Sequence, residues 1–250
     1  QILSGDLVSN GDFSQESSEL ITNGNFATDS DWGKSSNWTI SGGAANSNGS
    51  NGAIYQNIGL VSGKTYKVNV EVSLTSGSLY VREGNNGSVA EAITQSGSYE
   101  IYLISGTATS QVGYIQFYSI SFNGSIDNVS VKEVGQDWLI QNGWSIGDDV
   151  AIFSGTASAY RTIYQENILT VSNKYRLTFD IVSISSGSIE NISQSNPISY
   201  NTIGTKTEDF IATNASLFLK PTTTSDLTIT NISVIEITDD TNLPRIDYSP

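Results

Sequence analysis

The sequence predicts an all-β protein made of two tandem antiparallel β-sandwich domains. Apolar and polar side chains alternate along residues 66–73 and again along residues 175–182. Alternation with a period of two is typical of a strand with one buried face. Gly, Ser, Thr and Asn are abundant, and no long segment shows a helical period. This composition indicates short strands joined by many turns.

The two alternating segments belong to a sequence repeat. Tyr55 corresponds to Tyr164 and Tyr66 to Tyr175, and each pair is 109 residues apart. Further matches join Asp31-Trp32 to Asp137-Trp138, Trp38-Thr39-Ile40 to Trp144-Ser145-Ile146, and Asn128–Val131 to Asn231–Val234. Because the match spans the whole copy, we expect each copy to be a complete domain. The tryptophans recur in both copies, which favours core packing over sugar stacking.

The repeat sets the expected domain boundaries. A chain of 250 residues has room for two domains of ordinary size. We expect an N-terminal segment at 1–18, a first domain at 19–134, a second and diverged domain at 135–238, and a C-terminal connector at 239–250. The near absence of a linker predicts closely coupled domains.

Two similar segments precede the first domain. Leu7–Phe13 and Leu20–Phe26 each combine apolar residues, an Asn-Gly turn and a phenylalanine. We call them the first and the second leader. Only six residues separate them, so the first leader cannot begin a domain of its own. One hypothesis is that it supplies an edge strand to the second domain, within the chain or in a neighbouring copy.

The remaining strands follow at the spacing of a two-sheet sandwich. After the long alternating strand, we expect strands in the first domain at 79–82, 99–104, 112–118 and 126–134. The corresponding closing strand of the second domain is expected at 227–237.

Composition excludes several functions. The formal charge of −14 argues against binding to nucleic acid. No apolar run approaches the about 18 residues that a membrane span requires. The chain contains neither Cys nor His, so thiolate metal sites and Ser-His-Asp triads are excluded. Catalysis would require a pair of carboxylates, and no pair lies in a known motif; we therefore expect no enzyme. The lack of Met and of a signal peptide suggests a processed chain or part of a longer one.

Several segments together resemble a known family. The leader LITNGNF, the tryptophan that follows it, the strand GLVSGKTYKVNVEV and the closing IDNVSVKEV look like jelly-roll carbohydrate-binding modules of the family-4/9 type. The resemblance covers residues 19–134 well and residues 137–238 more loosely. It implies non-catalytic jelly rolls that often bind glycans and often hold a structural calcium ion.

The resemblance and the strand alternation together indicate a glycan site in the first domain. The candidate residues are the outward-facing polar and aromatic side chains Asn69, Glu71, Tyr80, Arg82, Tyr102, Gln116 and Tyr118. The alternative is that these tyrosines pack against a neighbouring domain, another subunit or covering loops. The second domain has few aromatic residues at the matching positions, which favours a spacer role there.

The resemblance also implies a calcium site in the first domain. The matching positions are Asn23, Asn25 and Asp127, whereas the acidic residue that often follows the leader phenylalanine is replaced by Ala27. The alternative for Asp127 is a structural role at a strand end. No calcium is expected in the second domain, where Thr230 replaces the closing aspartate.

A second resemblance concerns the biological context. Tandem NGDF and NGNF segments followed by TNLPRIDYS, at Thr241–Ser249, are similar to segments of bacteriophage fibre and other virion proteins. This implies a non-catalytic structural or adhesive module on the virion surface, in a fibre, decoration or tail appendage. Its expected partners are other virion proteins, copies of itself and surface glycans, without membrane insertion. The alternative is a carbohydrate-binding appendage of a secreted bacterial enzyme or adhesin.

Overall fold

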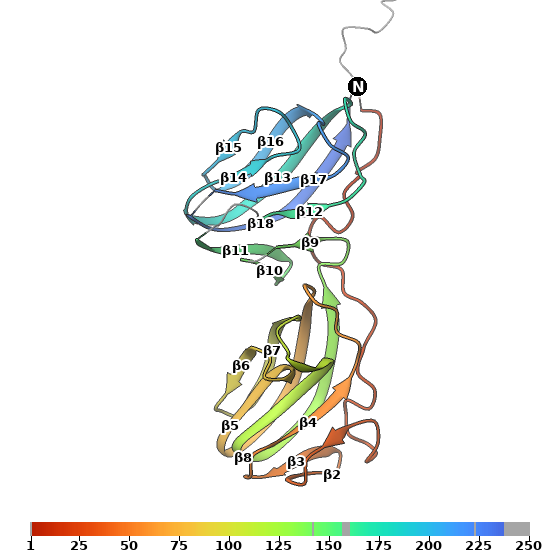
Figure 1. The fold of residues 1–250 in the computed structure, drawn as a ribbon, viewed down its shortest axis with the longest axis vertical. Coiled ribbons are helices and arrows are strands. Elements are labelled where there is room, and N and C mark those ends of the chain that lie inside the picture. The colour runs from red at the N-terminus through yellow and green to blue at the C-terminus, as the bar shows by residue number, and fades with distance from the viewer. Residues whose placement is uncertain (1, 142, 157–160, 223, 238–250) are drawn as a thin grey trace, which may run out of the picture. The chain divides into compact units, whose positions relative to one another are not determined.

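The computed structural model describes residues 2–141, 143–156, 161–222 and 224–237 (Figure 1). It confirms the all-β prediction, because every helix or strand assigned within these residues is a β-strand and the strands pair antiparallel. In this part of the chain no helix is long and apolar enough to cross a membrane. The predicted connector 239–250 lies outside the described residues.

The chain forms two compact units. The first unit contains Ser14–Gln136 and Ser145–Gly147. The second unit contains the described residues of Gln1–Phe13, Asp137–Trp144 and Asp148–Pro250. The N-terminal segment up to Phe13 therefore belongs to the unit of the second repeat.

The first unit is a β-sandwich in which two strands run through both layers. Its strands are β1 (Gly33–Lys34), β2 (Trp38–Ser41), β3 (Ala44–Asn48), β4 (Gly52–Asn57), β5 (Thr65–Asn85), β6 (Val89–Ile93), β7 (Gly97–Ile104) and β8 (Ser110–Val134). Strands β5 and β8 pair along nearly their whole length and curve together (Figure 1). The two segments expected at 66–73 and 79–82 are thus parts of one continuous strand.

A bend in β5 and β8 separates the two layers. The β5–β8 register shifts between Leu74 and Ser76 and again between Ser76 and Ser78. Gly77 has a φ of 82°, and a Cβ atom there would lie 2.0 Å from the Ser121 carbonyl oxygen. The C-terminal half of β5 pairs with β6, and the N-terminal half of β8 pairs with β4; we call these two halves, with β1, β4 and β6, layer A. The N-terminal half of β5 pairs with β7, and the C-terminal half of β8 pairs with β3; these two halves, with β2, β3 and β7, form layer B.

The second repeat folds into two separate five-stranded sheets. One sheet has the order β10-β11-β18-β13-β16, and the other β15-β14-β17-β12-β9. The strands are β9 (Leu139–Ile140), β10 (Trp144–Gly147), β11 (Val150–Thr156), β12 (Ile163–Gln165), β13 (Lys174–Ser186), β14 (Ile189–Asn191), β15 (Ser199–Tyr200), β16 (Gly204–Ile211), β17 (Leu217–Pro221) and β18 (Thr224–Glu236). By sequence correspondence β13 and β14 match the two halves of β5.

The tryptophans lie in the cores, as predicted. Trp32, Trp38, Trp138 and Trp144 are all buried. Trp38 stacks on Phe122 at a centroid distance of 5.7 Å. The inward half of the alternating strand, Tyr66 to Val72, is buried in the first unit. Burying large aromatic and aliphatic side chains in this way is the main source of stability of such a sandwich.

The first leader pairs with an edge of the second unit within the same chain, as one form of the edge-strand hypothesis predicted, although residues 7–13 are not assigned as a strand. Leu7 N donates to the Val234 carbonyl oxygen at 2.8 Å, and Ile232 N donates to the Gly11 carbonyl oxygen at 2.9 Å. The ring of Phe13 is buried. Residues 7–13 thus complete one edge of β18, although they come more than 120 residues before the repeat that they serve.

The second leader makes the same contacts with the first unit. Leu20 N donates to the Val131 carbonyl oxygen at 3.0 Å, and Val129 N donates to the Gly24 carbonyl oxygen at 2.9 Å. Each leader glycine touches its partner strand, since a Cβ atom on Gly11 or Gly24 would lie 1.9 Å from a carbonyl oxygen. Only glycine fits so close to the backbone of another strand.

A buried carboxylate stabilises one end of the first unit. Glu83 on β5 is fully buried. It accepts backbone N–H groups from Gly106 at 2.6 Å, Thr107 at 3.3 Å and Gly113 at 3.2 Å. Burial by itself raises the pKa of Glu83, but these donors outweigh it and hold the pKa below its ordinary value. Glu83 is therefore ionised in the folded chain, and its carboxylate fixes the segment that joins β7 to β8.

The second unit has a buried acid whose pKa is shifted in the opposite direction. Glu208 on β16 is 5% exposed and faces the same side as the core residue Leu177, its partner in register. It accepts a hydrogen bond from the Tyr200 hydroxyl at 3.0 Å, and hydrogen bonding to Asn191, Tyr200 and Gln194 offsets only part of the effect of its burial. Burial raises the pKa of Glu208 above its ordinary value.

Replacing Glu208 with glutamine is expected to stabilise the second unit by about 1 kcal/mol at pH 7, because the variant removes a poorly solvated charge. A folded-state pKa above the unfolded value means that Glu208 favours folding most below the unfolded pKa and loses this contribution as the pH rises. The gain from Glu208→Gln should therefore shrink towards pH 4. Urea unfolding at both pH values measures it, with the exposed Glu166→Gln as the control. A large loss of stability at pH 7 would contradict the prediction.

Candidate functional site

The bend in β5 and β8 divides the predicted glycan-binding residues into two groups. Tyr80, Arg82, Gln116 and Tyr118 lie in layer A. Asn69, Glu71 and Tyr102 lie in layer B. The bend thus separates Tyr102 from the four layer A residues, because it turns the two halves of β5 into different layers.

The layer A residues form two rows across neighbouring strands. Tyr80 lies opposite Tyr118, and Arg82 lies opposite Gln116. Their neighbours in sequence, such as Val81 and Phe117, are fully buried in the core, so the four side chains share the outer face of the sheet. Cross-strand neighbours on one face are about 4.5–5.5 Å apart at Cβ, close enough to act together.

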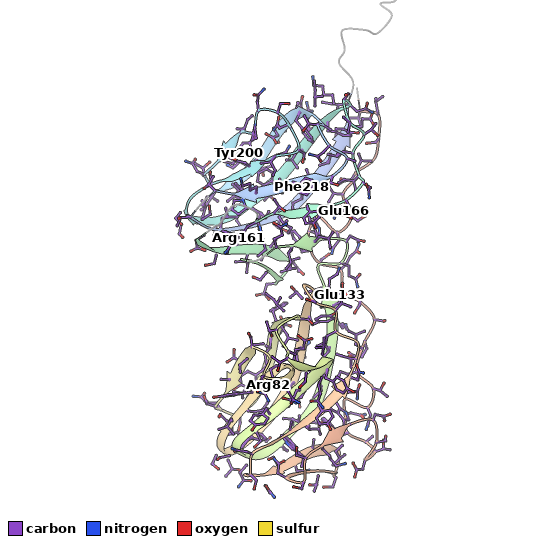
Figure 2. All side chains as sticks on the ribbon, in the orientation of Figure 1. Arg82, Glu133, Arg161, Glu166, Tyr200 and Phe218 are labelled. Carbon is purple, nitrogen blue, oxygen red and sulfur yellow. The ribbon has the colours of Figure 1, made fainter. Side chains whose placement is uncertain are left out.

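Arg82 is held over an aromatic ring. Figure 2 labels Arg82 in the first unit. Its guanidinium carbon lies 4.3 Å from the centroid of the Tyr118 ring, and its Nε donates to Gln116 Oε1 at 2.6 Å. Desolvation lowers the pKa of Arg82, and the neighbouring Tyr118 opposes this change. Such cation–π contacts contribute about 0.5–2 kcal/mol and fix the orientation of the guanidinium.

Gln116 helps to hold Arg82 in this orientation. It is 1% exposed, and its Nε2 donates to Asn85 Oδ1 at 3.2 Å and to Gln111 Oε1 at 3.4 Å. Because its amide already has partners on both sides, Gln116 positions Arg82 and is not accessible to a ligand.

Two further tyrosines, outside the seven candidate residues, lie on this face. Tyr55 on β4 lies opposite Gln116, and its ring meets the ring of Tyr114 edge-on at 5.9 Å. Tyr114 alternates with Gln116 and Tyr118, so its position could be predicted from the sequence. Tyr55 served only as a marker of the repeat. Together Tyr55, Tyr80, Arg82, Tyr114 and Tyr118 form what we call the tyrosine face.

The layer B residues lie in a charged environment. Lys67 pairs with Glu100 at 2.9 Å and with Glu16 at 3.1 Å, and hydrogen bonding to Glu100 raises the pKa of Lys67. Tyr102 lies opposite Lys67 and donates its hydroxyl to Glu100 at 3.0 Å. A Cβ atom on Gly147 would be 3.0 Å from the Tyr102 ring, so part of this ring is covered.

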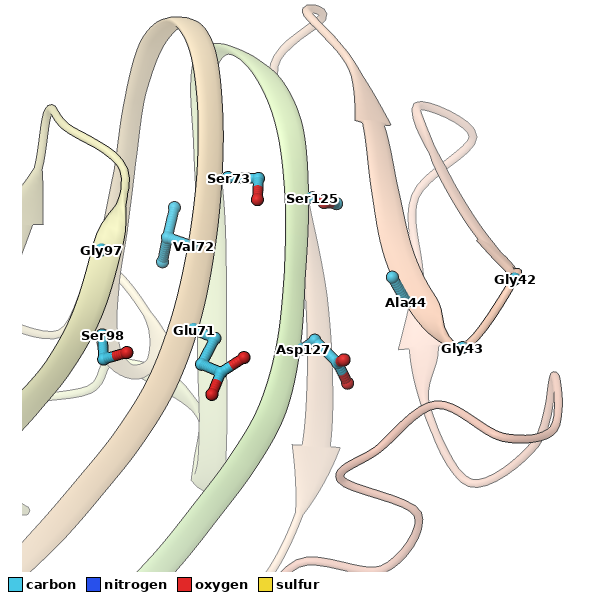
Figure 3. Close-up of a pocket in the computed structure, with 10 residues that line it drawn as sticks. All are labelled: Gly42, Gly43, Ala44, Glu71, Val72, Ser73, Gly97, Ser98, Ser125 and Asp127. Atoms are coloured by element: carbon cyan, nitrogen blue, oxygen red, sulfur yellow. The ribbon is translucent and has the colours of Figure 1, made fainter.

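A hollow of about 350 Å³ lies on layer B (Figure 3). The carboxylates of Glu71 and Asp127 line it from neighbouring strands, where the two residues are directly opposite each other. Ser98 and the glycines Gly42 and Gly43 also line it. Among the described residues neither carboxylate forms an ion pair. The hollow can attract cations or accept hydrogen bonds from hydroxyl groups.

The predicted calcium ligands have separate local roles. Asn23 shapes its own turn, since its Nδ2 donates to the carbonyl oxygens of Thr28 at 2.7 Å and Ser30 at 3.1 Å. Asn25 Oδ1 accepts the Ala27 N–H at 3.3 Å. Asp127 lies in the hollow with Glu71 and accepts its neighbour's N–H. Within the described residues, no group of three or more acidic, His or Cys side chains could hold a metal ion.

The second unit lacks the tyrosine pair. Its matching cross-strand pairs are Glu190 with Lys220 and Tyr164 with Phe218. The rings of Tyr164 and Phe218 stack at a centroid distance of 5.0 Å. An acid and a lysine thus occupy the positions of Tyr80 and Tyr118.

No protein-family model and no curated protein sequence matches the chain. Among solved structures, similarity is found to the N-terminal CBM22-1–CBM22-2 tandem domain of Paenibacillus barcinonensis Xyn10C, with a TM-score of 0.31, 10% identity, and coverage of 88% of this chain and 98% of that one. A structure of Sulfolobus Turreted Icosahedral Virus matches with a TM-score of 0.25, 13% identity and coverage of 84% and 60%. The major capsid protein P2 of Bacteriophage PM2 matches with a TM-score of 0.22, 10% identity and coverage of 85% and 99%. At these TM-scores the function has to be argued from the residues of this chain.

Proposed function

We propose that this chain is a non-catalytic structural and adhesive module of a phage virion, and that its first unit contacts surface glycans through the tyrosine face. The observation that carries the proposal is the pairing of the half-buried Tyr80 and Tyr118 on the outer face of layer A, with Arg82 held over Tyr118. Aromatic faces provide flat apolar area for sugar rings, and a guanidinium offers several N–H donors to hydroxyl groups.

Two features support an adhesive role without catalysis. The chain has no His and no Cys, which removes most nucleophile and base pairs. Gln116 is buried and fully bonded, so it fixes Arg82 before any ligand arrives. A ligand group that is fixed in advance loses less entropy on binding. No structural calcium is required by this proposal.

The second unit serves as a spacer in this proposal. The acidic and basic pair Glu190 and Lys220 replaces the tyrosine pair there, and the aromatic residues Tyr164 and Phe218 stack on each other. The virion context is supported by the similarity of Thr241–Ser249 to virion proteins, and this segment lies outside the described residues. Other virion proteins and copies of the chain are its proposed partners. Mass spectrometry of purified virions tests the location, and absence of the chain from them would contradict it.

A glycan array with the whole chain tests the adhesive role. We expect Tyr118→Ala to weaken binding of any captured glycan about tenfold or more, because it removes both a stacking surface and the support of Arg82. Tyr102→Ala is the matched control, since Tyr102 is a partly exposed tyrosine of the other layer. Titration of the captured glycan by calorimetry measures both variants.

Two outcomes would contradict this prediction. If Tyr102→Ala abolishes binding while Tyr118→Ala does not, the glycan site lies on layer B. If the intact chain captures no glycan, its contribution to the virion is structural only. Thermal melting of each variant shows whether the first unit remains folded.

A further inference from the structure

The side chains of Gln165 and Trp138 in the second unit form hydrogen bonds with the backbone of the first leader. The side chain of Gln165 accepts the Ser9 N–H at 3.1 Å and donates to the Ser9 carbonyl oxygen. The indole Nε1 of Trp138 donates to the Asn10 carbonyl oxygen at 2.8 Å. Gln165 and Trp138 are both buried. With the paired edge of β18, they form what we call the acceptor site.

The leader side chains that enter the acceptor site are few. Phe13 is buried and its ring lies 5.3 Å from the ring of Trp138. Val8 is 9% exposed. Asp6 Oδ1 accepts the Val234 N–H at 3.0 Å, which extends the pairing with β18. Backbone pairing with pockets for a few side chains is how sheets bind extended peptides.

The first unit repeats this arrangement with the second leader. Gln56 bonds both backbone groups of Thr22 at 2.9 Å, and Trp32 Nε1 donates to the Asn23 carbonyl oxygen at 3.1 Å. The ring of Phe26 lies 5.1 Å from the ring of Trp32. Two independent copies of the same contacts show that a leader and its acceptor are a matched pair.

We propose that the acceptor site of the second unit is a binding site for a leader strand, and that a second copy of the chain can supply this strand in place of the chain's own residues 2–13. The leader is not adjacent in sequence to the rest of its unit, which resumes only at Asp137. Since every leader contact described above can form equally within one chain or between two, exchange loses none of them. Such exchange of an identical element is a low-cost route to oligomers.

The separability of the leader is tested on the folded full chain. A protease recognition sequence is inserted between Phe13 and Ser14, and the folded protein is cut there. We expect the cut segment to stay bound during size-exclusion chromatography and to be displaced by excess labelled peptide of residues 2–13, in mild urea that opens the site. A peptide with Gly11→Ala should bind about tenfold more weakly or worse, because its new Cβ atom would lie 1.9 Å from the Ile232 carbonyl oxygen.

Gly5→Ala is the matched control, since a Cβ atom on Gly5 meets nothing within 4 Å. This control peptide should bind as the parent peptide does. Failure of the labelled peptide to enter the cut protein would overturn the proposal. Equal binding of the parent and Gly11→Ala peptides would overturn it as well.

Exchange between copies is tested on the uncut chain. Concentrated protein is warmed until the second unit begins to open, then cooled, and its mass is measured by light scattering. We expect dimers that dissociate only on renewed warming, that persist in Gly5→Ala and that are lost in Gly11→Ala. Dimers that form equally in Gly11→Ala, or an intact chain that stays monomeric throughout, would exclude the exchange.

Discussion

Replacing Phe13 with alanine is expected to lower the free energy of unfolding of the second unit by about 3–5 kcal/mol and to leave the first unit unchanged. The ring of Phe13 is 2% exposed and packs on Trp138, so its removal leaves a cavity in the core of that unit. The effect falls on residues more than 120 positions further along the chain. Hydrogen exchange measured separately over β8 and β18 locates the loss of protection.

Phe26→Ala is the reciprocal variant. Phe26 is 1% exposed and packs on Trp32, so the same loss should fall on the first unit only. If both variants destabilise the same unit, the pairing of the two leaders with their units is wrong.

Glu83→Gln is expected to destabilise the first unit by about 3 kcal/mol at pH 7. The carboxylate accepts three backbone N–H groups, and an amide would turn one of its own donors towards them. Urea unfolding measures the change, with Glu71→Gln as the control, because Glu71 lies on the same strand with its side chain exposed. An equal effect of both variants would contradict the proposed role of Glu83.

The contribution of Glu83 depends on pH in a defined direction. Its pKa is lower in the folded than in the unfolded chain, so its stabilisation is complete above the unfolded value and is lost as the pH falls through the folded value. The difference between the parent protein and Glu83→Gln should therefore shrink below about pH 4. The pKa of Glu208 changes in the opposite direction on folding, because burial raises it. A difference that grows on acidification would show that Glu83 is not held as the carboxylate.

Strand alternation and the repeat were sufficient to predict the fold class, the buried face of the long strand and the burial of the tryptophans. Tyr66, Val68, Val70 and Val72 are buried as expected. The tryptophans are also buried, as their recurrence in both copies predicted. Alternation did not reveal that β5 is one strand of two layers. The bend depends on register shifts near Gly77 and on the close approach of Ser121, which is distant in sequence.

The same bend explains which part of the candidate site could be predicted. Tyr80, Arg82 and Tyr118 were assigned correctly to one face, because each lies next to a core residue on its own strand. Tyr102 was grouped with them because alternation gives the side of a strand but not the layer to which it belongs. The burial of Gln116 also needed the structure, since its partners Asn85 and Gln111 come from two different strands.

The first leader pairs with the second unit and the second leader with the first, which has a consequence for the synthesis of the chain. During translation the second leader meets its partner strand after about one domain has been made, whereas Gly11 must wait for Ile232, which is 221 residues later. At about 5–20 residues per second, this delay lasts roughly 10–45 s. Throughout that time the apolar face of Phe13 and Val8 has no partner strand of its own. The first leader is thus synthesised long before the strand with which it pairs.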